Sequence, residues 1–351
     1  MAVSINKKQI LKIFLWVLIL IGFLFLIRTM NLSEIYDCLK SITLPLILLL
    51  AGLQFLTQIL LNYQWCHIAR VMGFKPKFWR MFYLNSKGTL VESITPGAKI
   101  GGEVTRGILF KAEFQCSTAD SASIVAIQKI ISIGSLVLLN LTAFMLLPLS
   151  VPFLSPALKI ALQTTMFLLL LLLILLLFQP QFLSKKLSVY RFKHKSFQKL
   201  QTGLIEYSNH AQKIRSAKSL IFELLLSVFI WALFPFKLAL LAGQYQKGIN
   251  PLAILSATLT AYFISMIPIS PGGLGVFEVT LSSLLIMFGL TSEQAFLTAV
   301  IFRFFTFWFV ILYSVFIILI YDLFQKLKKM ISDKKEKEYA DKKIANKKIF
   351  Q

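Results

Sequence analysis

Charged residues are scarce in this chain. Asp, Glu, Lys and Arg make up 15% of its 351 residues, hydrophobic residues make up 57%, and the mean hydropathy is +0.75. Soluble domains are usually about half apolar and about a quarter charged. Water would not keep a chain of this composition in solution, so we expect lipid to be its solvent.

Cysteine and histidine are rare, and neither forms a pattern that would hold a metal ion. The three cysteines show no CxxC and no zinc-ligand spacing. The three histidines, His67, His194 and His210, fall in segments that we expect to be cytoplasmic loops. The sequence also lacks a P-loop, a dinucleotide fingerprint and a nucleophile with a neighbouring base. We therefore predict no metal site, no cofactor and no ATP hydrolysis.

Acidic residues are few: 15 Asp and Glu stand against 37 Lys and Arg, and the net charge is +22. In a soluble protein this excess would suggest nucleic-acid binding. Here the basic segments alternate with long apolar runs, which is the positive-inside pattern of membrane proteins. The pattern argues against a nucleic-acid partner and predicts an inner or plasma membrane protein with both termini in the cytoplasm. The basic segments expected inside are 1–12, 67–87, 99–120, 179–218 and 322–351.

Long apolar runs predict six full membrane spans. A spanning helix needs about 20 apolar residues, and hydrocarbon offers the backbone no hydrogen-bond partner, so these runs must be helical. The first run is followed by no signal-peptide cleavage site, so we expect it to remain as a helix. The expected spans are about 10–28, 44–65, 121–147, 158–178, 219–242 and 295–321.

The chain is expected to form one transmembrane domain over residues 1–322. It divides into a first half, about 10–178, and a second half, 219–322. The basic cytoplasmic connector between them, 179–218, is too short for a typical catalytic domain. The Lys-rich tail, 323–351, is expected to be solvated or to lie on the membrane surface. The predicted fold class is an all-α polytopic membrane protein.

Two further regions are hydrophobic but too short to span. The first contains the stretches 80–94 and 104–114, and its flanks are basic on both sides. The second contains 252–268 and 276–289, and both of its flanks are expected outside. Because each region is broken by glycine and proline, we predict two re-entrant helical hairpins that enter the membrane from opposite faces.

The two breaks share a pattern that predicts an inverted repeat. Residues 95–103 read TPGAKIGGE and residues 270–278 read SPGGLGVFE, so each has a hydroxyl residue, Pro-Gly, five residues and Glu. Paired Gly/Pro interruptions in two halves indicate a transporter-type site. The alternative is that two purely structural turns share this pattern by coincidence. A helix that restarts after such a break offers free N–H groups to a phosphate. The candidate backbone residues are Pro96, Gly97, Gly101, Gly102, Pro271, Gly272, Gly273 and Gly275.

Ionisable and amide residues near these breaks are the candidate substrate-binding side chains. Ionisable groups at membrane depth are costly and usually mark a pathway or a buried pair. Two interpretations stay open: the residues contact the substrate, or the pairs Glu103–Arg106 and Glu278–Arg303 only hold the hairpins in place. The candidates are Glu103, Arg106, Glu278, Arg303, Lys129 and Gln128.

Other polar residues in the spans have simpler interpretations. Gln54, Gln58 and Asn62 are spaced to share one helix face, which we expect to look into the bundle. Lys237 is expected to extend toward the outer headgroups. Glu223 is expected near an interface, where it needs no special role.

The motifs resemble the lysylphosphatidylglycerol synthase transmembrane family, also called the flippase-like domain family. The resemblance covers about residues 10 to 322 and implies a membrane domain with re-entrant helices that carries lipids between leaflets. The larger members add a soluble synthase domain after the membrane part, and this chain resembles the stand-alone members without that domain. The matching residues are Thr95, Pro96, Gly97, Gly101, Gly102, Glu103 and Arg106, then 268–278, Gly289 and Arg303.

The chain departs from the family pattern at two places. Many members carry Glu-Arg where this chain has Gln128 and Lys129, and a basic or polar residue where it has Phe277. The headgroup cannot therefore be copied from the family. The sequence predicts a lipid flippase whose partner is an anionic or aminoacylated membrane phospholipid, and it leaves homo-oligomerisation open. The alternatives are a phosphatidylglycerol lysyltransferase-related enzyme and a non-transporting partner of an envelope lipid or glycan enzyme.

Overall fold

The structure, a computed structural model, is helical throughout the residues it describes. These are 32–95, 100–146, 156–179, 217–266 and 270–349, with isolated positions between 182 and 208. The expected first span, about 10–28, most of the connector and the residues Pro96 and Gly97 lie outside them. The prediction of an all-α membrane protein is confirmed for the described part of the chain.

The helices of the first half are α2 (Leu32–Lys40), α3 (Leu44–Val71), α4 (Phe78–Ile94), α5 (Ile100–Phe114), α6 (Thr118–Leu146) and α7 (Pro156–Phe178). Those of the second half are α10 (Ala217–Ala242), α11 (Pro251–Ser265), η1 (Pro271–Gly273), α12 (Val276–Met287), α13 (Ser292–Arg303), η2 (Phe304–Trp308) and α14 (Phe309–Ile349).

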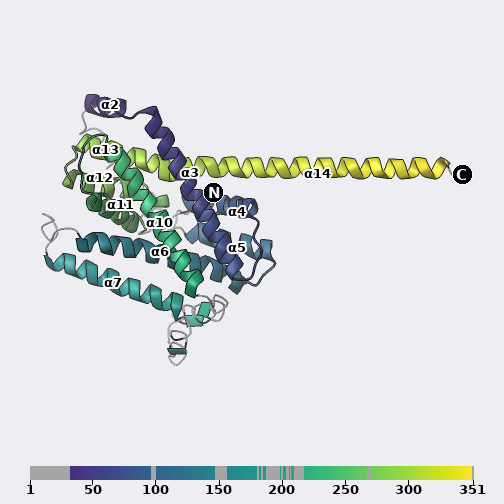
Figure 1. The fold of residues 1–351 in the computed structure, drawn as a ribbon, viewed down its shortest axis with the longest axis horizontal. Helices are drawn as coiled ribbons and strands as arrows, with labels where there is room; N and C mark the ends of the chain where they lie inside the picture. The colour runs from purple at the N-terminus through teal and green to yellow at the C-terminus, as the bar shows by residue number, and fades with distance from the viewer. Residues whose placement is uncertain are drawn as a thin grey trace, which may run out of the picture.

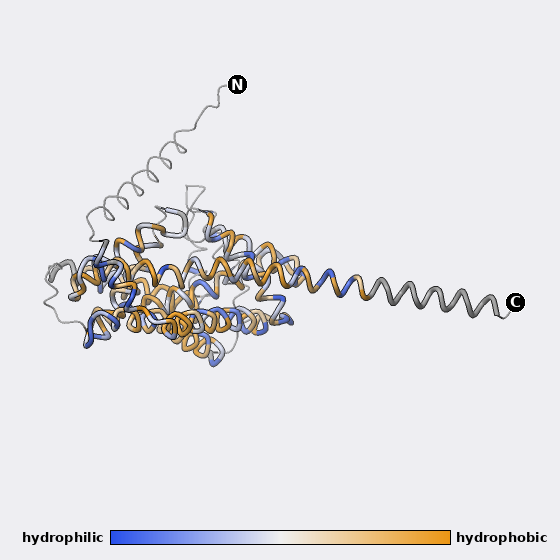
Figure 2. The backbone as a smooth tube through the Cα atoms, turned by 90° about the horizontal axis from the view of Figure 1, so that it is seen from above, coloured by the Kyte–Doolittle hydropathy of each residue, from blue (hydrophilic) through white to orange (hydrophobic). Residues whose placement is uncertain are grey.

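Four of these helical segments are long and apolar enough to cross a membrane. They are Leu44–Val71, Thr118–Leu146, Lys218–Ala242 and Ser292–Ile331. Figure 2 shows hydrophobic residues along the helices of the bundle, with hydrophilic residues gathered mainly at their ends. This distribution fits helices whose middle lies in hydrocarbon and whose ends reach water.

The two regions that are too short to span fold as two helical hairpins. In the first, α4 and α5 run antiparallel, because Gly102 lies against Glu92 and Gly88 against Arg106. In the second, α11 and α12 pack together on either side of the turn that contains η1. Each hairpin follows a long helix, α3 or α10, and precedes another helix, α6 or α13 (Figure 1).

Short polar signals set several helix ends. The Asn250 side chain caps the start of α11 by accepting from the Leu252 N–H, and Thr291 and Gln294 form a capping box at the start of α13. Side chains of these types satisfy N–H groups that have no partner inside a helix. Gly289 ends the second hairpin with φ at +102°, a conformation that favours glycine.

Buried side chains form two large cores rather than one. One core joins α10, α11, α12 and α13 to the first part of α3, around residues such as Leu50 and Phe277. The other joins α4, α5 and α6 to the last part of α3, around residues such as Trp65 and Phe110. Helix α3 therefore connects the two halves along its length.

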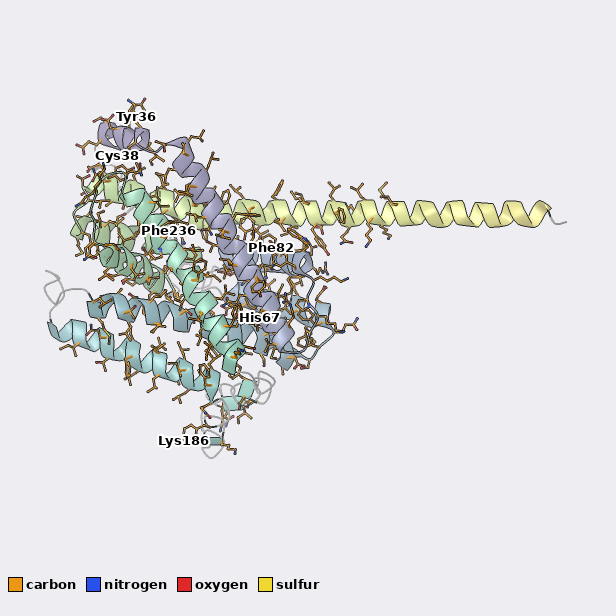
Figure 3. All side chains as sticks on the ribbon, in the orientation of Figure 1. Tyr36, Cys38, His67, Phe82, Lys186 and Phe236 are labelled. Atoms are coloured by element: carbon orange, nitrogen blue, oxygen red, sulfur yellow. The ribbon has the colours of Figure 1, made fainter. Side chains whose placement is uncertain are left out.

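Two features of the first half differ from the sequence predictions. Helix α2 is not predicted at all, because its nine residues are too few for a span. Helix α3 continues to Val71, so His67 lies in a helix and the prediction of a loop there is wrong. In Figure 3, His67 lies along α3 at the opposite end from Cys38 of α2.

The last predicted span is not one uniform α-helix. Helix α13 gives way at Phe304 to a π-helical segment, η2, before α14 resumes at Phe309. Helix α14 then continues to Ile349 and leaves the bundle as a straight rod (Figure 1). The tail is thus a direct continuation of the last span and not a separate segment.

Candidate functional site

A cavity of about 210 Å³ lies between the two helical hairpins. Its walls come from α3, α4, α5 and α6 of the first half and from α10, α11, α13, η2 and α14 of the second half. The turn of the second hairpin also reaches it through Ser270, Gly272 and Gly273. One chamber therefore brings together segments that lie far apart in the sequence.

Arg106 supplies a cation from the first hairpin. Its guanidinium donates to Glu92 over 3.0 Å and to the Thr89 hydroxyl over 3.1 Å, both on the facing helix α4. Glycine at position 88 leaves room for the arginine, because a Cβ there would lie 2.6 Å from the Arg106 Cγ. The guanidinium also lies over the Trp65 ring at 5.7 Å. These contacts hold Arg106 at the cavity wall.

A second cation, Lys129 of α6, forms an ion pair with Glu103 of α5. Both residues line the cavity. Their side chains are 27% and 23% exposed, so this pair is more accessible than the pairs of Arg106 and Arg303. The pair links the first hairpin to the helix that follows it.

Arg303 supplies the third cation, from the end of α13. Its Nε lies 3.3 Å from a carboxylate oxygen of Glu278, and it donates to the Gly272 carbonyl in the turn of the second hairpin. The guanidinium lies between the rings of Phe277 and Phe307, at 4.7 and 4.4 Å from their centres. Cation–π contacts of this kind are strongest where water is excluded. Arg303 therefore ties the hairpin turn to the last span.

Glu278 has a second task at the restart of the second hairpin. Its other carboxylate oxygen accepts from the Gly275 N–H over 2.7 Å, which caps α12. Gly275 has φ at +80°, and a side chain there would be strained. The Gly275 N–H, where the helix restarts after this break, is therefore already bonded within the protein and is not free for an anion.

Amides form a further part of the polar wall, beside several hydroxyl side chains. Asn85 donates to Asn62 over 2.9 Å, and Gln128 donates to Gln64 over 3.2 Å. Gln54 and Asn62 are buried on one face of α3 and Gln58 lines the cavity, as the sequence predicts. Buried amides need such partners, since an unpaired one costs about 1–3 kcal/mol.

The structure places most of the predicted site residues at this cavity and corrects one pairing. Glu103 and Arg106 share a face of α5, but they do not pair: Arg106 bonds to Glu92, and Glu103 to Lys129. The predicted pair Glu278–Arg303 is present. The cavity wall includes Glu103, Arg106, Gln128, Lys129, Gly272, Gly273 and Arg303.

The remaining predicted residues lie close to the cavity or outside the described chain. Glu278 contacts the cavity through Arg303, and Gly101 packs against Thr95 at the end of α4. Pro271 begins η1, while Pro96 and Gly97 are not described. Roles for these residues in binding a substrate stay predictions.

Sequence reasoning missed Glu92 and Thr89. Both precede the first break by less than two helical turns, in a stretch that is rich in polar residues but contains no other acidic one. An acidic residue there could have indicated a partner for Arg106, because antiparallel helices bring positions on either side of a turn together. The sequence alone does not indicate whether Glu92 or Glu103 would pair with Arg106.

Two charged residues away from the cavity make contacts that the sequence analysis does not predict. Lys237 is fully buried and bonds to Gln54 and to Thr57, so the prediction that it reaches the outer headgroups is wrong. Glu223 is buried and bonds to Nδ1 of His67 over 2.5 Å. The contact joins α10 to the last part of α3.

Comparisons with known proteins agree with this architecture. A UPF0104 membrane protein of Methanothermobacter thermautotrophicus is 22% identical over 292 residues, which cover 79% of this chain and 85% of that protein. A second UPF0104 membrane protein, from Methanocaldococcus jannaschii, is 30% identical over 109 residues, or 30% of each chain. The family model described as the lysylphosphatidylglycerol synthase TM region matches residues 10–314. Because this match covers most of the sequence, the chain belongs to the family of the lysylphosphatidylglycerol synthase transmembrane region.

Proposed function

We propose that this protein is a lipid translocase, or flippase, which moves a phospholipid or aminoacyl-phospholipid headgroup between leaflets through the cavity. The observation that carries the proposal is that three ion pairs gather around one chamber inside a membrane protein. Charged groups at membrane depth are costly and mark substrate pathways. A purely structural core would be expected to avoid them.

The proposal takes both helical hairpins as re-entrant and the two halves as an inverted repeat, in a plasma membrane protein with cytoplasmic termini. Its support is the matching order of elements and of ion pairs. Glu103 pairs with Lys129 on the next helix, and Glu278, its counterpart in the second motif, pairs with Arg303 on the next helix. Transporters with inverted repeats hold their substrates between such broken helices.

The size of the cavity suits a headgroup rather than a whole lipid. Sites for drug-sized molecules occupy about 300–1,000 Å³, whereas this chamber holds about 210 Å³. The acyl chains would stay in the surrounding hydrocarbon while the polar group crosses between the hairpins. Arg106, Arg303 and Lys129 would receive the phosphate, and the carboxylates would balance them or contact a cationic group.

A reconstitution experiment tests the proposal. Purified protein in vesicles should accelerate the exchange of fluorescent lipids between leaflets, as measured by chemical quenching of the outer leaflet. Arg106→Gln should lower this rate at least ten-fold, because it removes a cation from the cavity wall. No acceleration over empty vesicles with any headgroup would refute the translocase.

The chain supplies a matched control on the same hairpin. Arg80 and Glu113 also join α4 to α5, over 2.7 Å, but they lie outside the cavity. Arg80→Gln should leave the exchange rate within about two-fold of the original, since surface ion pairs contribute about 0–1 kcal/mol to stability. Equal losses in both variants would mean that Arg106 acts only by holding the hairpin together.

The same experiment separates the proposed translocase from its two alternatives. A lysyltransferase-related enzyme and a non-transporting membrane partner would both leave the rate of lipid exchange between leaflets unchanged. No described contact favours either one, and the basic connector of about 40 residues is short for a domain that binds aminoacyl-tRNA.

A further inference from the structure

We infer that the cavity selects headgroups that carry both a phosphate and an ammonium group and have no net charge, as in zwitterionic phospholipids. This inference rests on the proposed function and narrows its substrate class. The observation that carries it is the charge balance of the chamber, which follows from the ion pairs and not from the overall charge of +22.

Each cation at the described part of the cavity wall already faces one carboxylate. Arg106 has Glu92, Lys129 has Glu103, and Arg303 has Glu278. The three pairs together therefore contribute no net charge at the described cavity, with Glu278 in contact with Arg303 but not itself in the wall, although the chain as a whole is strongly basic. Among the described residues, the other buried charged side chains, Glu223 and Lys237, do not line the cavity.

Charge balance decides which headgroups can enter at low cost. In a medium of low dielectric constant, a net charge is expensive unless an opposite charge compensates it. An anionic headgroup would add a negative charge to a balanced chamber, and a cationic one would add a positive charge. A zwitterionic headgroup adds no net charge. Its phosphate can pair with a cation of the wall, and its ammonium group can pair with the carboxylate from which that cation separates.

The three pairs are not equally ready for this exchange. Arg303 is held by two aromatic rings and a backbone carbonyl, and its side chain is 6% exposed. Arg106 is held by Glu92, Thr89 and the Trp65 ring. Lys129 is the most exposed of the three cations, and Glu103 is the most exposed of their partners. The geometry assigns Lys129 to the phosphate and Glu103 to the ammonium group.

Vesicles that contain trace amounts of three acyl-labelled lipids provide the test. The probes are phosphatidylethanolamine, which is zwitterionic, phosphatidylglycerol, which is anionic, and its lysyl ester, which is cationic. All are measured in the same background lipid, so that surface attraction stays constant. The expected result is that phosphatidylethanolamine exchanges at least ten-fold faster than either charged probe.

Variants of the exposed pair should change this order in opposite directions. Glu103→Gln leaves the wall with one extra positive charge and should move the preference toward phosphatidylglycerol. Lys129→Gln leaves one extra negative charge and should move it toward the lysyl ester. The double variant Glu103→Gln/Lys129→Gln is balanced again and should prefer phosphatidylethanolamine, at a lower rate. Glu113→Gln, outside the cavity, should leave the order unchanged.

The possible results separate this inference from the proposed function. Equal acceleration of all three probes by the original protein would overturn the charge selection but keep the translocase. A preference for either charged probe would do the same. Acceleration of none would refute both. The ranking in the original protein is decisive even where a variant fails to fold, which thermal unfolding in detergent would reveal.

Discussion

At the scale of single residues, the first hairpin depends on glycine where its two helices cross. Gly102 lies so close to α4 that a Cβ would come within 2.7 Å of the Gly88 carbonyl oxygen and 2.6 Å of the Glu92 Cβ. Neither atom is the end of a flexible side chain, so the helices themselves would have to separate. This contact places Glu92 opposite Arg106 and thereby helps to position one of the three cavity pairs.

We predict that Gly102→Ala destabilises the protein by about 1–3 kcal/mol, the usual cost of overpacking a tight contact. It should also lower the exchange rate, because a displaced Glu92 no longer holds Arg106. The measurements are thermal unfolding in detergent and lipid exchange in vesicles.

Gly107, on the same helix, is the control. A Cβ there would meet nothing within 4 Å, so Gly107→Ala should be neutral or should stabilise α5 by up to about 1 kcal/mol through helix propensity. If both substitutions behaved alike, the close approach at Gly102 would not be what matters.

Lys237 shows where reasoning from residue type fails. A lysine late in an apolar run was predicted to extend toward headgroups, yet its stem turns inward to Gln54 and Thr57 of α3. Those partners lie some 180 positions earlier in the sequence. No local pattern in α10 indicates that α3 would present two polar groups at this depth.

At the scale of elements, the π-helical segment η2 deserves a functional test. Its extra residue lets the Phe309 N–H bond to the Phe304 carbonyl, five residues back. Thr306 and Phe307 of this segment line the cavity, next to Arg303 before it and Val310 after it. Single-turn π segments inside α-helices occur frequently at functional sites. Here the segment sets the rotation between α13 and α14.

We predict that deletion of Trp308 lowers lipid exchange at least ten-fold while the protein stays helical. Deletion removes the extra residue that makes the π turn, so the segment closes as an ordinary α-turn, and Thr306 and Phe307 change direction relative to the cavity. Circular dichroism and the vesicle assay measure the two parts of the prediction. Trp308→Phe keeps the length and should keep most of the rate; a fully active deletion variant would show that the register is unimportant.

The elements themselves were largely predictable, and the contacts between them were not. Apolar runs place α3, α6, α7, α10 and the last span, because lipid imposes helices on them. The Pro-Gly breaks place the two hairpins. The sequence does not predict η2, because a π turn reflects packing against α3 rather than local composition, nor does it predict that Arg106 pairs with Glu92.

At the scale of the whole molecule, two cores meet at a polar chamber. Each core belongs mainly to one half of the chain, and α3 contributes to both. The halves also pack directly, α6 against α10 and α11 and α4 against α14, so the cavity lies within an extensive contact between them. In transporters built from repeats, alternating access moves one half against the other around a fixed site, and under the proposed function these contacts are the ones that would have to slide.

Native cysteines provide reference points for the topology of this arrangement. Cys38 lies in α2, and Cys116 lies in the turn between α5 and α6. The charge pattern predicts that Cys38 lies outside and Cys116 inside. Burial and the carboxylates of Glu34, Glu293 and Asp37 raise the pKa of the Cys38 thiol. A raised pKa means that a smaller fraction of the Cys38 side chain is thiolate, the reactive form, at a given pH. The rate of its labelling therefore rises with pH, and labelling rates at different cysteines must be compared at one pH.

A cysteine at position 94 then tests whether the first hairpin ends within the membrane. The Ile94 side chain at the end of α4 is 76% exposed, so the protein itself does not shield this position. Helix α4 has 17 residues and is about 25 Å long at 1.5 Å per residue, which is shorter than the hydrocarbon core of about 30 Å.

In a chain whose native cysteines are serine, Ile94→Cys should react with a membrane-impermeant maleimide at least ten-fold more slowly than Cys38 or Cys116 in their own single-cysteine chains, from either side of sealed vesicles. After denaturation the three should react alike. Rapid labelling from the outside would mean that α4 crosses completely, and the chamber between the hairpins could then no longer lie at the middle of the bilayer.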